Sequence, residues 1–297
     1  MRHNYVLAMV GVALGAIAVI GAPGVARADQ DVIFTGSLSD AEKLLVNPFT
    51  IDVGTYVVSS NISGNLRGSA NTGGNNVDFS QDFGTDANET RVRAGFLWRI
   101  TPTQAVRFNY FNNDVSRTKQ ISQDINWGDN TYLAGGLVTA ETKFNIYEAS
   151  YEWAFVKHRN YDVSLTAGVH VEDFTVKLAG NATVTPPGGG PPSTASFQSQ
   201  SNSVTAPLPV IGLRADWAAM DHLYFDVSGQ LFKFSYQGID GNWSDIWVGM
   251  TWMFNEHFGV GVAYDRFAVH VDLTKGSFDG RLNLGYQGGL IFVRGAF

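Results

Sequence analysis

Two histidines in this chain of 297 residues are each followed, two positions later, by a carboxylate: His170 precedes Glu172, and His270 precedes Asp272. Residues i and i+2 of a β-strand lie on the same face, so each carboxylate could orient its imidazole as a general base. The chain has no cysteine, which excludes a thiol nucleophile, thiolate metal ligands and disulfides. His170 and Glu172 are therefore the candidates for catalysis, with an ordinary buried histidine as the alternative.

Many other charged residues fall at alternate positions, in phase with small and polar residues. Such a face can line the interior of a closed sheet. The charges there would either line a water-filled pore or form pairs that fill the lumen. The residues expected to face the lumen are Arg91, Arg93, Arg107, Glu148, Glu152, Arg214, Asp216, Asp226 and Asp265. We expect a closed or very narrow lumen, and a preference for cations if anything passes.

Strands are the elements that would position these residues. Between 161 and 173, every odd-numbered residue from Val163 to Val171 is apolar, whereas the even-numbered residues are small, polar or charged. This period of two predicts strands whose two faces meet different surroundings. It recurs in 89–100, 209–217, 223–231, 258–265 and 282–292. His270 and Asp272 share the phase of Val260 and Val262, so we expect them on the apolar outer face.

The connections between these strands alternate in length. Short connections are expected at 101–104, 157–160, 219–222 and 255–257. Longer ones are expected at 67–88, 120–137 and 180–206, with shorter links near 237–241 and 274–279. Strict alternation of this kind is typical of an antiparallel up-and-down transmembrane β-barrel, whose turns are short on one side and long on the other. Counting through it gives about ten strands, from near Thr50 to near Val293.

Tryptophan positions support the same fold. Four of the seven lie one to four residues before an expected short turn: Trp98, Trp153, Trp217 and Trp252. An aromatic girdle at a membrane interface predicts this placement, whereas tryptophans of a soluble core would lie near the middle of the strands. Composition agrees, because 16% charged residues are few for a soluble domain. A mean hydropathy of −0.04 excludes a bundle of membrane-spanning helices, and a net charge of −7 disfavours nucleic acid as a partner.

The N-terminus has the pattern of a secretory signal peptide over residues 1–28. Arg2 precedes the uncharged apolar run Val6–Ile20, and Ala26-Arg27-Ala28 offers the small-x-small cleavage pattern. We expect residues 29–48 to form a periplasmic segment, with a short helix over Ser37–Val46 that is capped by Ser37 or Ser39. The barrel is then expected to occupy 49–297.

With these features and a terminal Phe297, the chain resembles Gram-negative outer-membrane β-barrel proteins. The resemblance implies a monomer in the outer membrane, in contact with outer-membrane lipid and lipopolysaccharide and inserted by the barrel-assembly machinery, with no cofactor or metal. Ile291 and Val293 alternate toward Phe297 as such proteins require, but Leu284, Tyr286, Leu290 and Phe292 have the opposite phase. A bulge at Gly288-Gly289 would reconcile the two series.

Three functions remain open at this level. The first is a structural protein or a narrow small-solute or ion channel with exposed outer loops. The second is an adhesin-like surface protein that binds through those loops. The third, a hydrolase, is less favoured, because ten-stranded outer-membrane proteases oppose their Asp and His with a pair of Asp, and lipid deacylases of this type need His-x-Ser. The part of the sequence expected to form the barrel, 49–297, contains neither Asp-x-Asp nor His-x-Ser, so we expect no enzyme.

Overall fold

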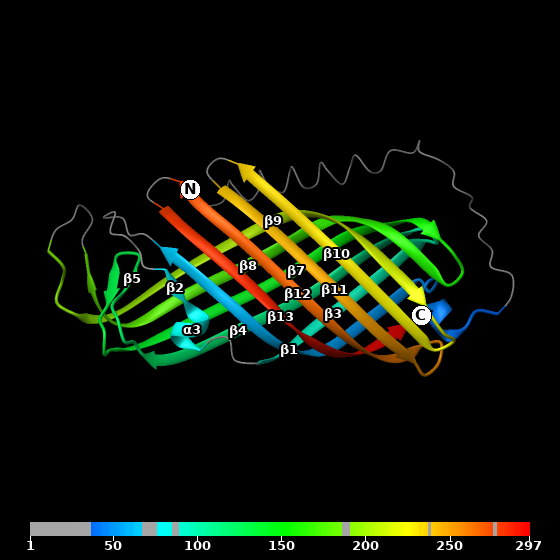
Figure 1. Ribbon diagram of the computed structural model, residues 1–297, viewed down its shortest axis with the longest axis horizontal. Helices are drawn as coiled ribbons and strands as arrows, with labels where there is room; N and C mark the ends of the chain where they lie inside the picture. The colour runs from blue at the N-terminus through cyan, green and yellow to red at the C-terminus, as the bar shows by residue number, and fades with distance from the viewer. Residues whose placement is uncertain (1–36, 67–75, 85–88, 186–190, 237–238, 276–277) are drawn as a thin grey trace.

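The computed structural model describes residues 37–66, 76–84, 89–185, 191–236, 239–275 and 278–297 (Figure 1). The expected signal peptide at 1–28 lies outside these residues, as do parts of the loop 67–88 and residues 186–190 of the Pro-Gly run.

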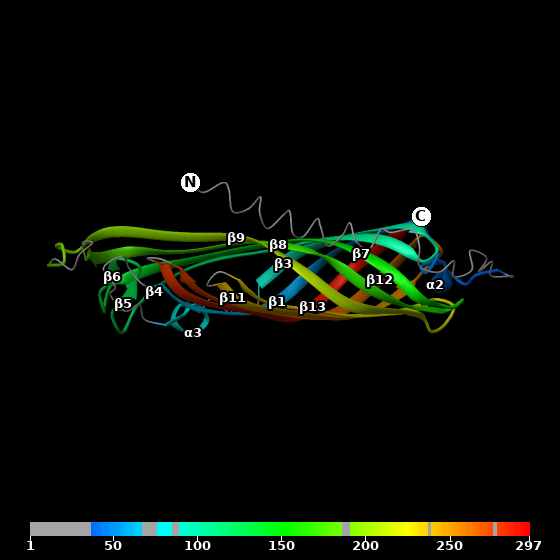
Figure 2. The same cartoon turned by 90° about the horizontal axis from the view of Figure 1, so that it is seen from above.

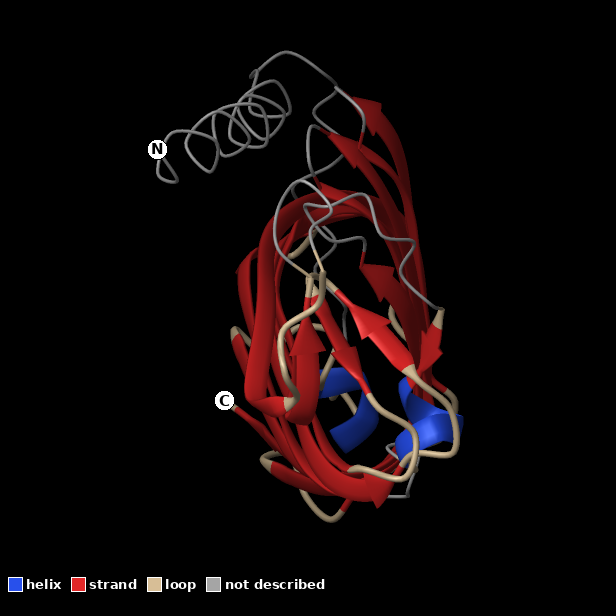
Figure 3. Cartoon of the chain, turned by 90° about the vertical axis from the view of Figure 1, so that its left-hand side faces the viewer, coloured by secondary structure: helices blue, strands red, loops and turns tan. Residues whose placement is uncertain are grey.

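Ten long strands form a barrel in which each strand is antiparallel to the next and the first pairs with the last. They are β1 (Phe49–Leu66), β3 (Glu89–Thr101), β4 (Gln104–Gln120), β7 (Leu137–Lys157), β8 (Tyr161–Val184), β9 (Ser196–Ala218), β10 (Leu223–Tyr236), β11 (Ile239–Met253), β12 (Phe258–Lys275) and β13 (Phe278–Ala296). Seen along the long axis, they enclose an elongated ring (Figure 3). The predicted all-β, up-and-down barrel of ten strands is confirmed.

The outside of the barrel changes character at one level on every strand. Toward the short turns the exposed residues are apolar, and toward the long connections they are polar. On β7 the change falls between Tyr147 and Asn145, and on β12 between Tyr264 and Arg266. A band of apolar side chains around a barrel, bounded by polar residues, is typical of the surface that faces the hydrocarbon layer of a membrane. The alternation read from the sequence produces the band, because every second residue of a strand faces outward.

The wall of the barrel is not equally high all round. β7, β8 and β9 have 21, 24 and 23 residues, whereas β10 and β11 have 14 and 15. As a result β8 and β9 run well past the neighbouring strands at the end with the long connections (Figure 2). Two short strands, β5 (Ile125–Trp127) and β6 (Asn130–Tyr132), accompany this tall wall.

A short helix closes the opposite end. α2 (Asp40–Lys43) has Ser39 as its N-cap, and Ser39 and Glu42 form a capping box. The expected helix over Ser37–Val46 is thus present but shorter. Ala41 of the helix and the two leucines that follow it pack on residues at the short-turn ends of the strands: Ala41, Leu44 and Leu45 against Ala218, Tyr224, Met253 and Ala296. Among the described residues, no helix is long and apolar enough to cross a membrane.

A second helix was not predicted. α3 (Phe79–Phe83) follows the two-residue strand β2 (Val77–Asp78) in the first long connection. Asp78 caps its N-terminus and Gly84, with φ +70°, ends it. Phe79 and Phe83 are buried, and the ring of Phe79 meets Trp127 of β5 edge to face at 5.3 Å. The sequence of this loop is mostly polar, so its five-residue helix gave no periodic signal.

The expected bulge at Gly288-Gly289 is wrong. β13 pairs with β1 and with β12 in unbroken register through both glycines. Leu284, Tyr286, Leu290 and Phe292 instead face the interior, with 2–5% of their surface exposed, while Ile291 and Val293 face outward. Both series fit one regular strand because the interior of this barrel is partly apolar. A bulge would be needed only in a barrel whose interior is polar throughout.

Candidate functional site

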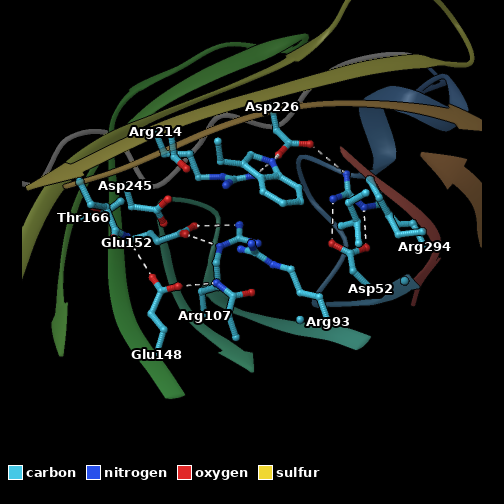
Figure 4. A pocket seen from close by; sticks show the side chains of 18 residues that line it. Asp52, Arg93, Arg107, Glu148, Glu152, Thr166, Arg214, Asp226, Asp245 and Arg294 are labelled. Carbon is cyan, nitrogen blue, oxygen red and sulfur yellow. Dashed lines mark hydrogen bonds and ion pairs between the residues drawn. The ribbon is translucent and has the colours of Figure 1, made fainter. Parts of the chain in front are cut away.

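The lumen is the candidate site, and its half nearer the short turns is lined with charge. Arg294 holds Asp52 through two hydrogen bonds, from Nε at 2.7 Å and from Nη2 at 2.8 Å. Arg214 bridges two further carboxylates, with Nε 2.9 Å from Asp216 and Nη2 3.1 Å from Asp226. Asp52 and Arg294 are opposite each other on the paired strands β1 and β13, and Arg214 links its own strand β9 to the adjacent β10. Arg294 Nη1 is also 3.5 Å from Asp226 of β10, which is not a neighbour of β13, so this contact spans the lumen (Figure 4).

A second set of pairs continues the network toward the middle of the barrel. Arg107 donates to Glu152 at 2.6 Å, and Asn109 donates to Glu148 at 2.6 Å. Arg93 is paired with Asp265, and its guanidinium lies over the ring of Trp247, 4.3 Å from the centroid. Every one of these charges therefore has a partner of opposite sign or a hydrogen bond, as burial requires.

The structure places all nine residues expected in the lumen on the inner face of the wall. Six of them are buried: Glu148, Glu152, Arg214, Asp216, Asp226 and Asp265. Arg91 lies higher, at the outer rim, where its Nε donates to Asn113 at 2.8 Å and its Nη2 to the carbonyl of Asp114 at 2.7 Å. A cavity of about 40 Å³ remains between the charged side chains, which is room for about three water molecules.

Aromatic side chains fill the outer half of the interior. The rings of Phe267 and Tyr286 stack at 4.8 Å, Phe111 contacts Tyr286 at 4.8 Å, and Phe144 contacts Phe267 at 5.7 Å. Trp243 packs on Phe267 at 5.6 Å. The lumen thus has a charged tier on the side of α2 and an apolar tier on the side of α3.

His170 and Glu172 lie where the two tiers meet, and 2% and 6% of their surface is exposed. His170 Nε2 is 3.1 Å from Gln230 Oε1 and 3.5 Å from Glu148 Oε1, and its ring lies 4.4 Å from the ring of Trp243. His170 Nδ1 and Glu172 Oε1 have no hydrogen-bond partner among the described residues. The predicted arrangement, in which Glu172 orients the imidazole of His170, is not formed, because both side chains are separately packed into the barrel core.

His270 and Asp272 lie on the outer face, as their phase predicted, but above the apolar band. His270 Nε2 is 2.9 Å from Asp272 Oδ2, and Arg281 Nε donates to Asp272 Oδ1 at 2.7 Å. His270 also contacts Asn283. These residues form a polar cluster on β12 and β13 rather than a membrane-facing patch. Within the described ranges, no group of three or more His, Asp and Glu side chains is arranged to hold a metal.

The four tryptophans are on the outside, with 44–50% of their surface exposed. Each is paired with the first residue of the adjacent strand: Trp98 with Phe49, Trp153 with Gln104, Trp217 with Tyr161 and Trp252 with Leu223. Since those residues begin strands at the short-turn end, the four indoles lie at one level of the barrel.

Two lumen residues were missed by sequence reasoning, Asp52 and Arg294. Each lies on the inner face of its strand, and Arg294 is two residues beyond the buried Phe292. The signal was present in the alternation of β13, but two apolar series of opposite phase left the inner face of this strand undecided.

No protein-family model matches the sequence, and no curated protein matches it. Among solved structures, the outer-membrane protease OmpT from Escherichia coli is similar over 84% of this chain and 96% of its own, with a TM-score of 0.54 and 10% identity. The chain has the fold of an outer-membrane β-barrel.

Two further structures are matched with lower scores. A Pseudomonas aeruginosa FadL homologue has a TM-score of 0.36 and 10% identity, over 86% of this chain and 91% of its own. The attachment invasion locus protein Ail of Yersinia pestis has a TM-score of 0.30 and 8% identity, over 83% and 98%. At these identities the likenesses concern the fold alone.

Proposed function

We propose that the protein is an outer-membrane barrel with a closed lumen, which acts at the cell surface through its tall outer wall and not as a channel. The observation that carries the proposal is the filling of the lumen along its length. From the short-turn end outward, α2, the ion-pair network, the aromatic tier and α3 follow one another.

The charged tier supports a closed lumen because each of its four arginines is paired with a carboxylate. In a conducting pore, charged side chains face water and are available to passing ions. Here Arg294, Arg214 and Arg107 are each held by a carboxylate on their own or a neighbouring strand. Arg93 of β3 reaches Asp265 of β12, a strand that is not its neighbour. Passage of a hydrated ion would require several buried pairs to separate at once, and each separation would leave an uncompensated charge.

The tall wall supports a role at the surface. Above the apolar band, the outer faces of β4, β7, β8 and β9 carry polar and charged side chains, including the pairs Lys143–Glu141 and Lys177–Glu141 at 3.1 and 3.6 Å. A wall of this kind extends into water and presents a large area to other molecules. Catalysis is not favoured, since His170 and Glu172 are sealed inside the barrel.

The test is a planar-bilayer recording of the refolded full-length mature chain, with folding checked by the mobility of boiled and unboiled protein on a gel. We expect insertion without discrete conductance steps. Regular cation-selective steps from the folded protein would contradict the closed lumen and favour the narrow channel.

A further inference from the structure

The outer half of β9 has one open edge. β9 pairs with β8 along its whole length, from Ser196 opposite Ala182 to Trp217 opposite Tyr161. Its pairing with β10 covers only Ile211 to Ala218. Within the described chain, the residues from Ser196 to Val210 are therefore hydrogen-bonded on one side only. Figure 2 shows this part of β9 at the margin of the tall wall.

The two prolines of this segment reveal which residues present donors at the open edge. Pro207 and Pro209 have no N–H, and a proline within a sheet is accepted where its nitrogen faces away from the neighbouring strand. Their nitrogens therefore face the open edge. Backbone groups of a strand alternate in direction, so the odd-numbered residues also present their N–H and C=O there: Phe197, Ser199, Ser201, Ser203 and Thr205.

Beyond the two prolines, the part of the edge from Phe197 to Thr205 lacks the protection that sheet edges normally carry. Exposed edges are usually covered or marked with charged residues, which prevents pairing with another strand. The outer part of β4, at the opposite margin of the wall, is both charged and covered. Asp114 and Lys119 lie on it. Arg91 donates to the carbonyl of Asp114, and Lys119 donates to the carbonyl of Gln81 in α3. By contrast, no Asp, Glu, Lys or Arg occurs between Lys177 and Arg214.

We propose that the open edge of β9 pairs in antiparallel fashion with the same edge of a second copy of this chain in an opposing membrane. The proposal deepens the surface role inferred above and rests on it. An identical strand suits this edge because the segment is uncharged and can face itself without repulsion. Centred on Ser201, the pairing sets Ser199 opposite Ser203 and Phe197 opposite Thr205.

The symmetry of the pairing decides that the two copies lie in different membranes. Two identical antiparallel strands are related by a two-fold axis perpendicular to their sheet. The wall runs along the long axis of the barrel (Figure 2), so this axis lies parallel to the membrane. A two-fold rotation about it reverses the direction of the barrel. The second copy therefore points back from a facing membrane, and the pair joins two surfaces.

The experiment uses the full-length mature protein in two populations of lipid vesicles, labelled with donor and acceptor dyes. We expect wild-type vesicles to cluster, as measured by energy transfer and light scattering. S199K/S203K places lysine opposite lysine and should abolish clustering, and S199D/S203D should do the same. Mixing vesicles that carry S199K/S203K with vesicles that carry S199D/S203D should restore clustering. The matched control is N242K/S244K, with the same added charge on the outer face of β11, which is paired on both sides.

A cross-link tests the register. Residues opposite each other in an antiparallel hydrogen-bonded pair have Cα atoms about 5.5 Å apart, which a disulfide can bridge. Because the chain has no cysteine, S201C should form a disulfide between chains of the two populations, and S244C should not. Folded wild-type protein that fails to cluster vesicles, unchanged clustering by S199K/S203K, or dimers formed only within one population would each overturn the pairing. The closed lumen is judged separately by conductance, so the two proposals can fail independently.

Discussion

At the scale of single residues, stability depends on charges that can exist inside the barrel only as pairs. Arg294 is 3% exposed and holds Asp52 of the neighbouring strand β1, with Asp226 at 3.5 Å. Removing one partner leaves the other charge buried and uncompensated, whereas removing both leaves none. The network is therefore expected to respond more strongly to single than to paired substitutions.

Arg294→Ala should lower the free energy of unfolding by about 3–5 kcal/mol, the usual cost of breaking a buried pair. Asp52→Asn combined with Arg294→Gln should cost clearly less. Urea unfolding of the protein in lipid vesicles, followed by tryptophan fluorescence, measures both. Arg281→Ala, which breaks the exposed pair with Asp272, is the matched control and should leave the unfolding curve unchanged. Equal losses from the single and double variants would contradict the paired network.

At the scale of elements, α2 is held to the barrel by polar contacts as well as by its apolar face. Arg159, in the turn between β7 and β8, donates to Glu42 at 2.7 Å, and Lys157 Nζ donates to the carbonyl of Leu45 at 2.7 Å. Ala41 N–H donates to the carbonyl of Asp221 at 2.9 Å. The hydrogen bond from Arg159 is the main reason that the pKa of Glu42 lies below its ordinary value of 4.5.

The docking of α2 should therefore depend on pH. A carboxyl group whose pKa is lowered on folding stabilises the folded state above its unfolded pKa, and this contribution is lost as the pH falls through the folded pKa. We expect the segment 37–48 to become sensitive to an acid protease below about pH 4, while the barrel stays intact. With a protease active at neutral pH, Glu42→Gln should give the sensitive pattern already at pH 7, and Glu141→Gln, which removes a carboxylate of the tall wall, is the control. If Glu42→Gln resisted the protease as well as the wild type does, the pair of Arg159 and Glu42 would not be what holds α2 in place.

At the scale of the whole molecule, the apolar band and the ring of tryptophans fix the depth of the barrel in the membrane. Trp98, Trp153, Trp217 and Trp252 face outward at one level, whereas Trp127, Trp243 and Trp247 are buried in the interior. The two groups should therefore differ in their access to lipid.

Lipids brominated near the interface should quench the fluorescence of the outer four tryptophans and leave the inner three largely unaffected. Substituting any one of the four with phenylalanine should reduce the quenched fraction, because one accessible indole is lost. Trp243→Phe is the control, since it removes an unquenched indole and should raise that fraction. If Trp243→Phe lowered the quenched fraction as much as Trp98→Phe does, the assignment of these tryptophans to the inside and the outside of the barrel would be contradicted.

The sequence by itself determined the strands, their number and the residues of the membrane-facing girdle. These are local properties, since alternation, turn length and the position of a tryptophan before a turn can be read within about a dozen residues. The same local pattern marked which charges face inward, but it could not say that the outer half of the interior is apolar. For that reason the two apolar series of β13 suggested a bulge that the structure does not have.

The tertiary structure alone decided the rest. Arg294 and Asp52 are 242 residues apart in the chain, and they meet only because β13 closes the ring against β1. Closure also determines the height of each wall relative to its neighbours, which leaves the outer edge of β9 unpaired. Partners across a lumen and gaps between strands depend on how all ten strands are staggered, and no single strand carries that information.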